Sequence, residues 1–267
     1  MDHANIQDII DLVKCPLEDV NFIKLCQTKF KENGVLTLPN FLNEQIIDCL
    51  VEEGSDAQHK AFFSNSTHNV YLTKNDSKLS DDHVFNRQVV SSKGCITDDQ
   101  IPQISPLKTL YNSEIFREFL ASVLGEQKLY EYVDGLSSIN LHYASEGKEL
   151  GWHFDNSSFA ITLLLQAPDA GGSFEYIKDF RNSEAGEMNF DGVKSLLDGI
   201  TKPEVLKVDP GTLVLFRGKN SIHRVTPTIG NKTRMLVVLA YNTEPGISLS
   251  KSCLLYTSDA ADERRGV

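Results

Sequence analysis

The sequence lacks the features that mark membrane, secreted and zinc-cluster proteins. It has no apolar run long enough to span a bilayer, so no membrane partner is expected. The segment Met1-Asp2-His3 has neither the basic nor the apolar region of a secretory signal. The 5 cysteines form no CxxC pair, which argues against a disulfide framework or a zinc cluster. These absences predict a protein of the reducing cytoplasm.

Positive charge is also scarce. The chain has 26 Lys and Arg against 37 Asp and Glu, a formal net charge of -11. A nucleic-acid partner is therefore not expected, because phosphate binding needs clustered basic side chains. The remaining composition is that of a globular protein: 267 residues, of which 40% are hydrophobic and 24% charged. A chain of this length can bury a sizeable core.

The end of the chain is set apart from the rest. Residues 253–267 begin Cys-Leu-Leu-Tyr-Thr-Ser-Asp, which resembles the translation of a transposase-based sequencing adapter. We interpret residues 253–267 as read-through rather than native sequence and leave them out of fold reasoning. On this interpretation the native sequence after Ser252 is missing.

The first half of the chain has a helical pattern. Apolar residues recur at helical spacing, and Asn43 and Ser113 stand at expected N-caps. Residues 1–33 are predicted as an N-terminal helical extension, ahead of a domain over residues 34–252. Residues 64–103 are polar, and we expect an irregular loop there, either a lid or a surface excursion.

From about Ser137 the pattern changes to short strands separated by glycine and proline turns. The candidates are 138–143, 159–166, 173–177, 205–208, 212–216, 222–227 and 233–241. Helices followed by many short strands, without βαβ alternation, predict an α+β fold with a mainly-β core. We expect a double-sheet barrel with helices packed on one sheet.

One pair of residues suggests a metal site. Among 7 histidines, only His153 is followed two positions later by an acid, Asp155. About one such pair is expected by chance, so the match depends on its context. The pair lies just before a predicted strand, and residues two apart in an extended segment point to the same face. An imidazole and a carboxylate on one face can chelate one cation.

Two later residues extend this pattern. Iron(II) in oxygenases is held by two His and one carboxylate, which leaves the opposite face open for cosubstrate and O2. His223, on a strand that follows a tight turn, is the candidate third ligand. Arg234 lies 11 positions later (234 − 223), at the start of the last strand. Its guanidinium can bind the distal carboxylate of 2-oxoglutarate through a planar two-point pair.

This order of residues resembles that of the iron(II)/2-oxoglutarate dioxygenases. The segments Gly151–Asp155, Phe159–Gln166, Gly171–Tyr176 and His223–Pro227 are similar to the branch that acts on free amino acids, which includes hydroxylases and radical halogenases. The resemblance implies a double-stranded β-helix, related to jelly rolls and cupins. It also implies Fe(II), 2-oxoglutarate and O2 as cofactor and cosubstrates, with ascorbate as reductant.

The resemblance also bears on the reaction. Halogenases of that branch have a small residue in place of the metal carboxylate, which frees a position for chloride. This chain keeps Asp155. The resemblance therefore implies hydroxylation of an unactivated C–H bond of a free amino acid or derivative, with release of succinate and CO2. Desaturation or ring closure stays open, as do a peptidyl hydroxylase and a non-catalytic jelly-roll binding protein.

Further site residues are expected around the metal. Asn140 and His142 share one face of the preceding strand and, with Thr162, are assigned to the cosubstrate, although Thr162 is also an ordinary strand former. The residues assigned to the substrate are Arg87, for a carboxylate, Glu175, for an amine, and Asn156. The oligomeric state stays open.

Overall fold

The structure is a computed structural model that describes residues 5–134 and 136–248. The interpretation of residues 253–267 concerns residues outside these ranges. The helices are α1 (Ile6–Ile9), α2 (Val20–Asn33), α3 (Glu44–Ala57), α4 (Pro106–Asn112), α5 (Glu114–Leu124) and α6 (Phe190–Leu197). None of these described helices is long and apolar enough to cross a membrane.

Two helices end at a glycine, and the expected cap at Ser113 is present. Gly34 and Gly125 adopt left-handed φ angles of 69° and 81° after α2 and α5, and the Ser113 side chain caps α5. Asn43 is the N-cap residue of α3, but its side chain does not cap that helix. Its amide donates instead to the Asp8 carbonyl at 2.8 Å, which ties α3 to the end of α1.

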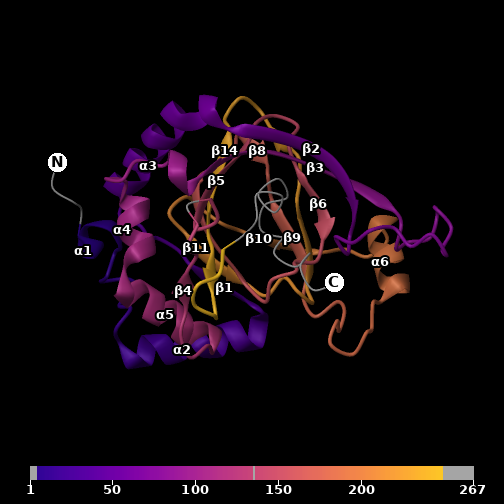
Figure 1. The fold of residues 1–267 in the computed structure, drawn as a ribbon, viewed down its shortest axis with the longest axis horizontal. Coiled ribbons are helices and arrows are strands. Elements are labelled where there is room, and N and C mark those ends of the chain that lie inside the picture. The colour runs from indigo at the N-terminus through magenta and orange to yellow at the C-terminus, as the bar shows by residue number, and fades with distance from the viewer. Residues whose placement is uncertain (1–4, 135, 249–267) are drawn as a thin grey trace.

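One curled sheet of 11 antiparallel strands forms the β core (Figure 1). Its strands run in the order β1-β11-β7-β14-β5-β3-β6-β12-β9-β10, with β2 paired to β3. They are β1 (Val35–Leu38), β2 (Phe62–Asn69), β3 (Gln88–Thr97), β5 (Ile139–Ala144), β6 (Leu150–His153), β7 (Ala160–Gln166), β9 (Phe174–Ile177), β10 (Glu204–Leu206), β11 (Leu213–Phe216), β12 (Ile222–Val225) and β14 (Arg234–Leu239).

Two small ribbons complete the strands. They pair β8 (Ala170–Gly171) with β13 (Thr228–Ile229), and β4 (Tyr130–Glu131) with β15 (Tyr241–Asn242). Each of the strands expected after residue 137 is present, with its ends shifted by up to two residues. The predicted mainly-β core with N-terminal helices on one sheet is confirmed, since α1 to α5 gather on one side of the strands in Figure 1.

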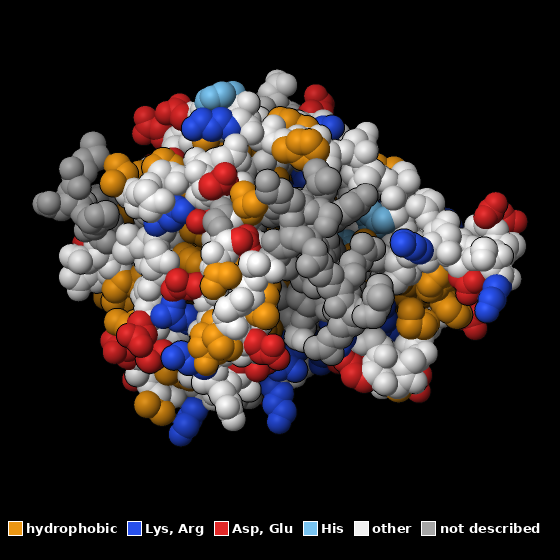
Figure 2. Space-filling view, viewed as in Figure 1, with side chains coloured by type: hydrophobic (Ala, Val, Ile, Leu, Met, Phe, Trp, Pro, Cys, Tyr) orange, Lys and Arg blue, Asp and Glu red, His pale blue; other side chains and the backbone are white. Residues whose placement is uncertain are grey.

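The main core lies between that helical layer and the sheet. Leu141, Leu163 and Val237, from neighbouring strands, are each 3% exposed or less and pack in one cluster with Phe116 of α5 and Phe30 of α2. Because side chains alternate along a strand, the residues between them face the barrel interior. Elsewhere, acidic and basic side chains are interspersed over the face drawn in Figure 2.

The expectation of an irregular loop over residues 64–103 is wrong. Phe62–Asn69 and Gln88–Thr97 form an antiparallel hairpin, and within residues 64–103 only 70–87 and 98–103 lie outside its strands. The outer strand, β2, pairs with β3 alone, so half of its side chains meet solvent and need not be apolar. A polar strand of this kind gives no hydrophobic alternation for sequence reasoning to detect.

Two helices were also missed. Helix α4 begins with Ser105 as its cap and Pro106 in its first turn, which is a readable start signal. Helix α6 begins after Asn189, whose side chain accepts from the Gly192 amide. It covers a second cluster formed by residues of β6, β12 and segment 70–87.

Candidate metal centre

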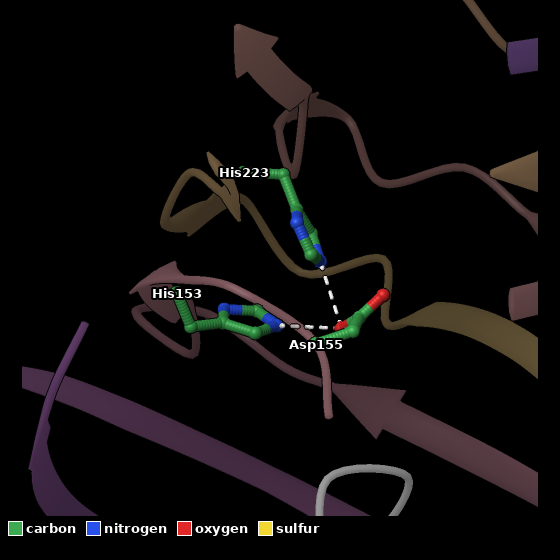
Figure 3. A group of neighbouring side chains, drawn as sticks. All are labelled: His153, Asp155 and His223. Carbon is green, nitrogen blue, oxygen red and sulfur yellow. Dashed lines mark ion pairs between the residues drawn. The ribbon is translucent and has the colours of Figure 1, made fainter. Parts of the chain in front are cut away.

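The candidate metal ligands meet through strand pairing. His153 is the last residue of β6, and His223 lies on β12. These strands are antiparallel neighbours in which His153 and His223 are register partners. Directly opposed side chains point to the same face, and the two imidazole centroids are 4.2 Å apart. Asp155 follows β6 by two residues and turns its carboxylate toward both rings (Figure 3).

The three side chains form a compact group. Their ligand atoms all lie within 4.8 Å of one another. The Nε2 atoms of His153 and His223 are 3.7 and 3.3 Å from Asp155 Oδ1. The residues are buried, at 7%, 5% and 6% exposure for His153, Asp155 and His223. Two imidazole nitrogens and one carboxylate oxygen at this spacing fit the ligand set of non-haem iron(II).

Backbone carbonyls fix both imidazoles. Nδ1 of His153 donates to the Gly151 carbonyl at 2.7 Å, and Nδ1 of His223 donates to the Ser221 carbonyl at 3.0 Å. A carbonyl can only accept, so each Nδ1 carries the hydrogen and each Nε2 keeps its lone pair for a cation. Sequence reasoning missed these two acceptors because a main-chain carbonyl leaves no side-chain signal.

The group is electrostatically coupled. Burial lowers the pKa of His153 to about 3, with a further lowering by His223 that Asp155 opposes. Burial also lowers the pKa of His223, but the charge and hydrogen bond of Asp155 outweigh it and leave that pKa raised. A divalent cation between the three groups would favour neutral imidazoles beside an ionised carboxylate, which is the protonation state that ligands require.

The residues assigned to the cosubstrate share the interior face. Register pairs Arg234 with Ala144 and Leu236 with His142, so Arg234 and His142 point the same way. Thr162 pairs with Val238 and therefore also lies on that face.

The interior face reaches the metal group. Phe216 lies two residues after Val214, the register partner of Thr162, and so shares its face. The Phe216 ring meets that of His223 at 4.8 Å between centroids. The cosubstrate candidates therefore line the same interior as the metal ligands.

Arg234 and His142 have unused polar groups. Burial lowers the pKa of Arg234 to about 10, and the half-buried guanidinium has no ion pair or hydrogen bond within the described ranges. His142 is 6% exposed, and its Nε2 has no partner among the described residues. Burial, Lys93 and Arg234 hold its pKa well below the ordinary value, so the ring is neutral. Asn140, by contrast, already donates to the Ser137 carbonyl at 3.1 Å.

Two substrate candidates are not brought to the metal group. Glu175 is the register partner of Arg224, one position away from the pair of Tyr176 with His223, so Glu175 points outward. Its carboxylate accepts from Arg224 at 2.7 Å, and the Arg224 guanidinium lies over the Trp152 ring. The expectation of an inward Glu175 is corrected by this register.

Arg87 is also engaged elsewhere. Its guanidinium pairs with Asp198 at the end of α6 and donates to the Leu197 carbonyl at 3.1 Å. It therefore ties segment 70–87 to α6 in this structure rather than meeting a substrate carboxylate. Asn156, the third candidate, is half-buried beside Asp155 in the loop after β6.

Comparisons with known proteins place the chain in a family. Residues 18–254 match the family described as Halogenase D, which covers most of the chain, α2 included. No curated protein gives a significant match. The boundary predicted between residues 33 and 34 stays a prediction.

Several solved structures share the fold. An oxidoreductase of the 2OG-Fe(II) oxygenase family from Burkholderia pseudomallei is 13% identical, with 85% of this chain and 93% of that chain covered and a TM-score of 0.55. The α-ketoglutarate-dependent carbocyclase SnoK from nogalamycin biosynthesis is 12% identical, with 84% and 87% covered and a TM-score of 0.55. A Trichoplax adhaerens prolyl hydroxylase, in complex with a hypoxia inducible factor peptide fragment, is 14% identical, with 82% and 89% covered and a TM-score of 0.51.

At these identities the structures establish the fold, while the family match rests on the sequence itself. The fold is the one that the motif order implied, and the buried His-Asp-His group lies at β6 and β12 of its sheet. The chain therefore belongs to the Halogenase D family, and it shares its fold with a 2OG-Fe(II) oxygenase and an α-ketoglutarate-dependent carbocyclase.

Proposed function

We propose that this chain is a 2-oxoglutarate-dependent hydroxylase of small molecules, although its family carries the name of a halogenase. The observation that carries the proposal is Asp155. One of its carboxylate oxygens is 3.3 Å from His223 Nε2 and 3.7 Å from His153 Nε2. A carboxylate there takes the position that a small residue would leave to a halide.

The proposed division of roles follows from the contacts. His153, Asp155 and His223 would hold the iron, which together with 2-oxoglutarate and O2 supplies the oxidation of the substrate C–H bond. The chain itself binds and orients. The Gly151 and Ser221 carbonyls hold the two imidazoles in the ligand tautomer.

Arg234 and His142 would bind 2-oxoglutarate. Arg234 is a half-buried cation without a protein carboxylate in the described ranges, and a guanidinium matches a carboxylate through two parallel hydrogen bonds. His142 offers a neutral Nε2 on the same face. Each would gain a partner that the described protein residues do not supply, which lowers the cost of their burial.

The proposed substrate is a free amino acid or a derivative of one. The resemblance of Gly151–Asp155 and Gly171–Tyr176 to the branch that acts on free amino acids supports this class. Because Arg87 and Glu175 are paired within the protein, neither is available for the charged ends of such a substrate without first breaking an ion pair. Asn156, next to the metal carboxylate, is the remaining candidate from the sequence.

The test is a product assay. Protein loaded anaerobically with iron(II) is mixed with 2-oxoglutarate, ascorbate, chloride and O2, and a panel of free amino acids is compared with proline-containing peptides. We expect succinate coupled to a product that has gained one oxygen atom, and loss of both in Asp155→Ala. A chlorinated product from the unaltered chain would contradict the proposal. If only the peptides stimulate succinate formation, the proposed function changes to peptidyl hydroxylation.

A further inference from the structure

Gly218 lies in the turn between β11 and β12, directly against the metal carboxylate. A Cβ atom built on Gly218 would stand 1.7 Å from Oδ2, 2.4 Å from Cγ and 3.0 Å from Cβ of Asp155. All three of its nearest atoms thus belong to one side chain. The backbone does not require glycine here, because Gly218 is absent from the residues with positive φ. The requirement comes from the Asp155 carboxylate.

The turn contacts both the main chain and the side chain of Asp155. The Asp155 amide donates to the Gly218 carbonyl at 3.1 Å, so main chain and side chain of Asp155 both rest on one residue. In Figure 3, Oδ1 faces the two imidazoles and the second oxygen points away from them. Contact at Oδ2 therefore sets how far Oδ1 reaches toward the histidines.

The turn is not free to retreat. The amides of Phe180 and Arg181 donate to the Asn220 carbonyl at 2.7 and 3.1 Å, and Arg181 Nε donates to the Lys219 carbonyl at 2.8 Å. The Ser221 carbonyl, one residue further on, fixes the His223 ring. A collision at position 218 is therefore relieved most easily by the short side chain of Asp155.

We propose that Gly218 is a positioning residue that determines whether the site can carry a carboxylate ligand. The proposal rests on the proposed iron site. A methyl group at position 218 displaces the Asp155 carboxylate from the two Nε2 atoms and leaves a two-histidine set. A small residue at position 155 would leave the same set. Asp155 and Gly218 thus act together: the third ligand is a carboxylate only when position 155 is an acid and position 218 has no side chain.

The test is an anaerobic titration of the full chain with Fe(II) alone, in which calorimetry measures the binding affinity. Gly218→Ala, in which the ligand loses its support, is expected to weaken Fe(II) binding about 10- to 100-fold. Asp155→Gly, which removes the ligand, is expected to weaken it at least as much. Lys219→Ala is the matched control in the same turn. Its ammonium pairs with Glu184 at 3.0 Å on the surface, so binding should stay as in the unaltered chain.

The double variant Asp155→Gly/Gly218→Ala is the decisive arm. Without the carboxylate the added methyl group has room, so the double variant should bind Fe(II) as Asp155→Gly does, a non-additive result. Unaltered affinity in Gly218→Ala, or a further tenfold loss in the double variant, would overturn the positioning role while leaving the iron site standing. Failure of the unaltered chain to bind Fe(II) would overturn both.

Folding is checked by thermal melting of the metal-free proteins. If Gly218→Ala is poorly folded because of the carboxylate, the double variant must melt at a higher temperature than Gly218→Ala. An equal or lower melting temperature in the double variant would place the collision elsewhere and refute the proposal.

Discussion

The two faces of the main sheet carry different kinds of residue on the same strands. Toward the helices, β5, β7 and β14 present fully apolar side chains such as Leu141, Leu163 and Val237. Toward the interior, the alternate positions present His142, Thr162 and Arg234. One face stabilises the barrel, and the other carries the groups proposed to bind cosubstrate. Along each strand, residues that stabilise the fold therefore alternate with residues of the proposed site. Substitutions on one face should lower stability, and substitutions on the other should lower activity.

The largest expected effect is at the metal group, where β12 of the same sheet carries His223. His223→Ala removes a proposed ligand, so we expect substrate-coupled succinate to fall below about one hundredth of the unaltered rate, more than the loss of a supporting residue costs. The fold should persist, because the main core lies on the other side of the barrel wall. Iron content measures the loss of the ligand, and near-ultraviolet circular dichroism measures whether the fold persists. Near-normal turnover in this variant would remove His223 from the ligand set.

The opposite face should respond in the opposite way. Leu163 is fully buried on the helix-facing side, and Leu163→Ala should lower the free energy of unfolding by about 2–5 kcal/mol. The folded fraction should still bind Fe(II) with unchanged affinity. Urea denaturation and metal titration of the same sample test this pair of expectations. A drop in Fe(II) affinity as large as the one in His223→Ala would show that the two faces are not independent.

A smaller effect is expected at the proposed cosubstrate anchor. Arg234→Gln keeps hydrogen-bonding capacity but loses the charge, and a charge-assisted hydrogen bond contributes about 1.5–3 kcal/mol. The Kd for 2-oxoglutarate should therefore rise roughly 10- to 100-fold, with Fe(II) affinity unchanged. Titration of the iron-loaded protein with 2-oxoglutarate measures it. Lys148→Gln, on a half-buried lysine of the loop between β5 and β6, is the control and should leave this Kd as it was.

The same separation of faces explains what the sequence could and could not predict. The strands after residue 137 carry apolar alternation and turn residues, so their existence could be read directly. The meeting of His153, Asp155 and His223 could be predicted because metal chemistry restricts residue type and order. The cosubstrate role of Arg234 stays a proposal, which its place on the His142 face supports. Glu175 could not, because its orientation depends on which residue of β12 it opposes, and a shift by one residue reverses the face.

Contacts between residues distant in sequence could not be predicted either. The role proposed for Gly218 needs Asp155 to lie on it, and these residues meet only through the tertiary fold. The polar hairpin of β2 and β3 has the composition of a loop and becomes a strand pair because β3 joins β5 and β6 in the sheet. In each case the deciding contact is with a residue distant in sequence.

The smallest expected effect tests whether Arg87 stays paired with Asp198. Its pair with Asp198 is partly exposed, and such a pair contributes only about 0.2–1 kcal/mol. Arg87→Ala should therefore lower the free energy of unfolding by less than about 1 kcal/mol and leave the substrate KM within twofold. Asp198→Ala is the matched control, because it breaks the same pair and leaves the guanidinium in place. A tenfold rise in KM in Arg87→Ala, absent from Asp198→Ala, would mean that Arg87 leaves Asp198 to bind substrate, and segment 70–87 would then belong to the substrate site.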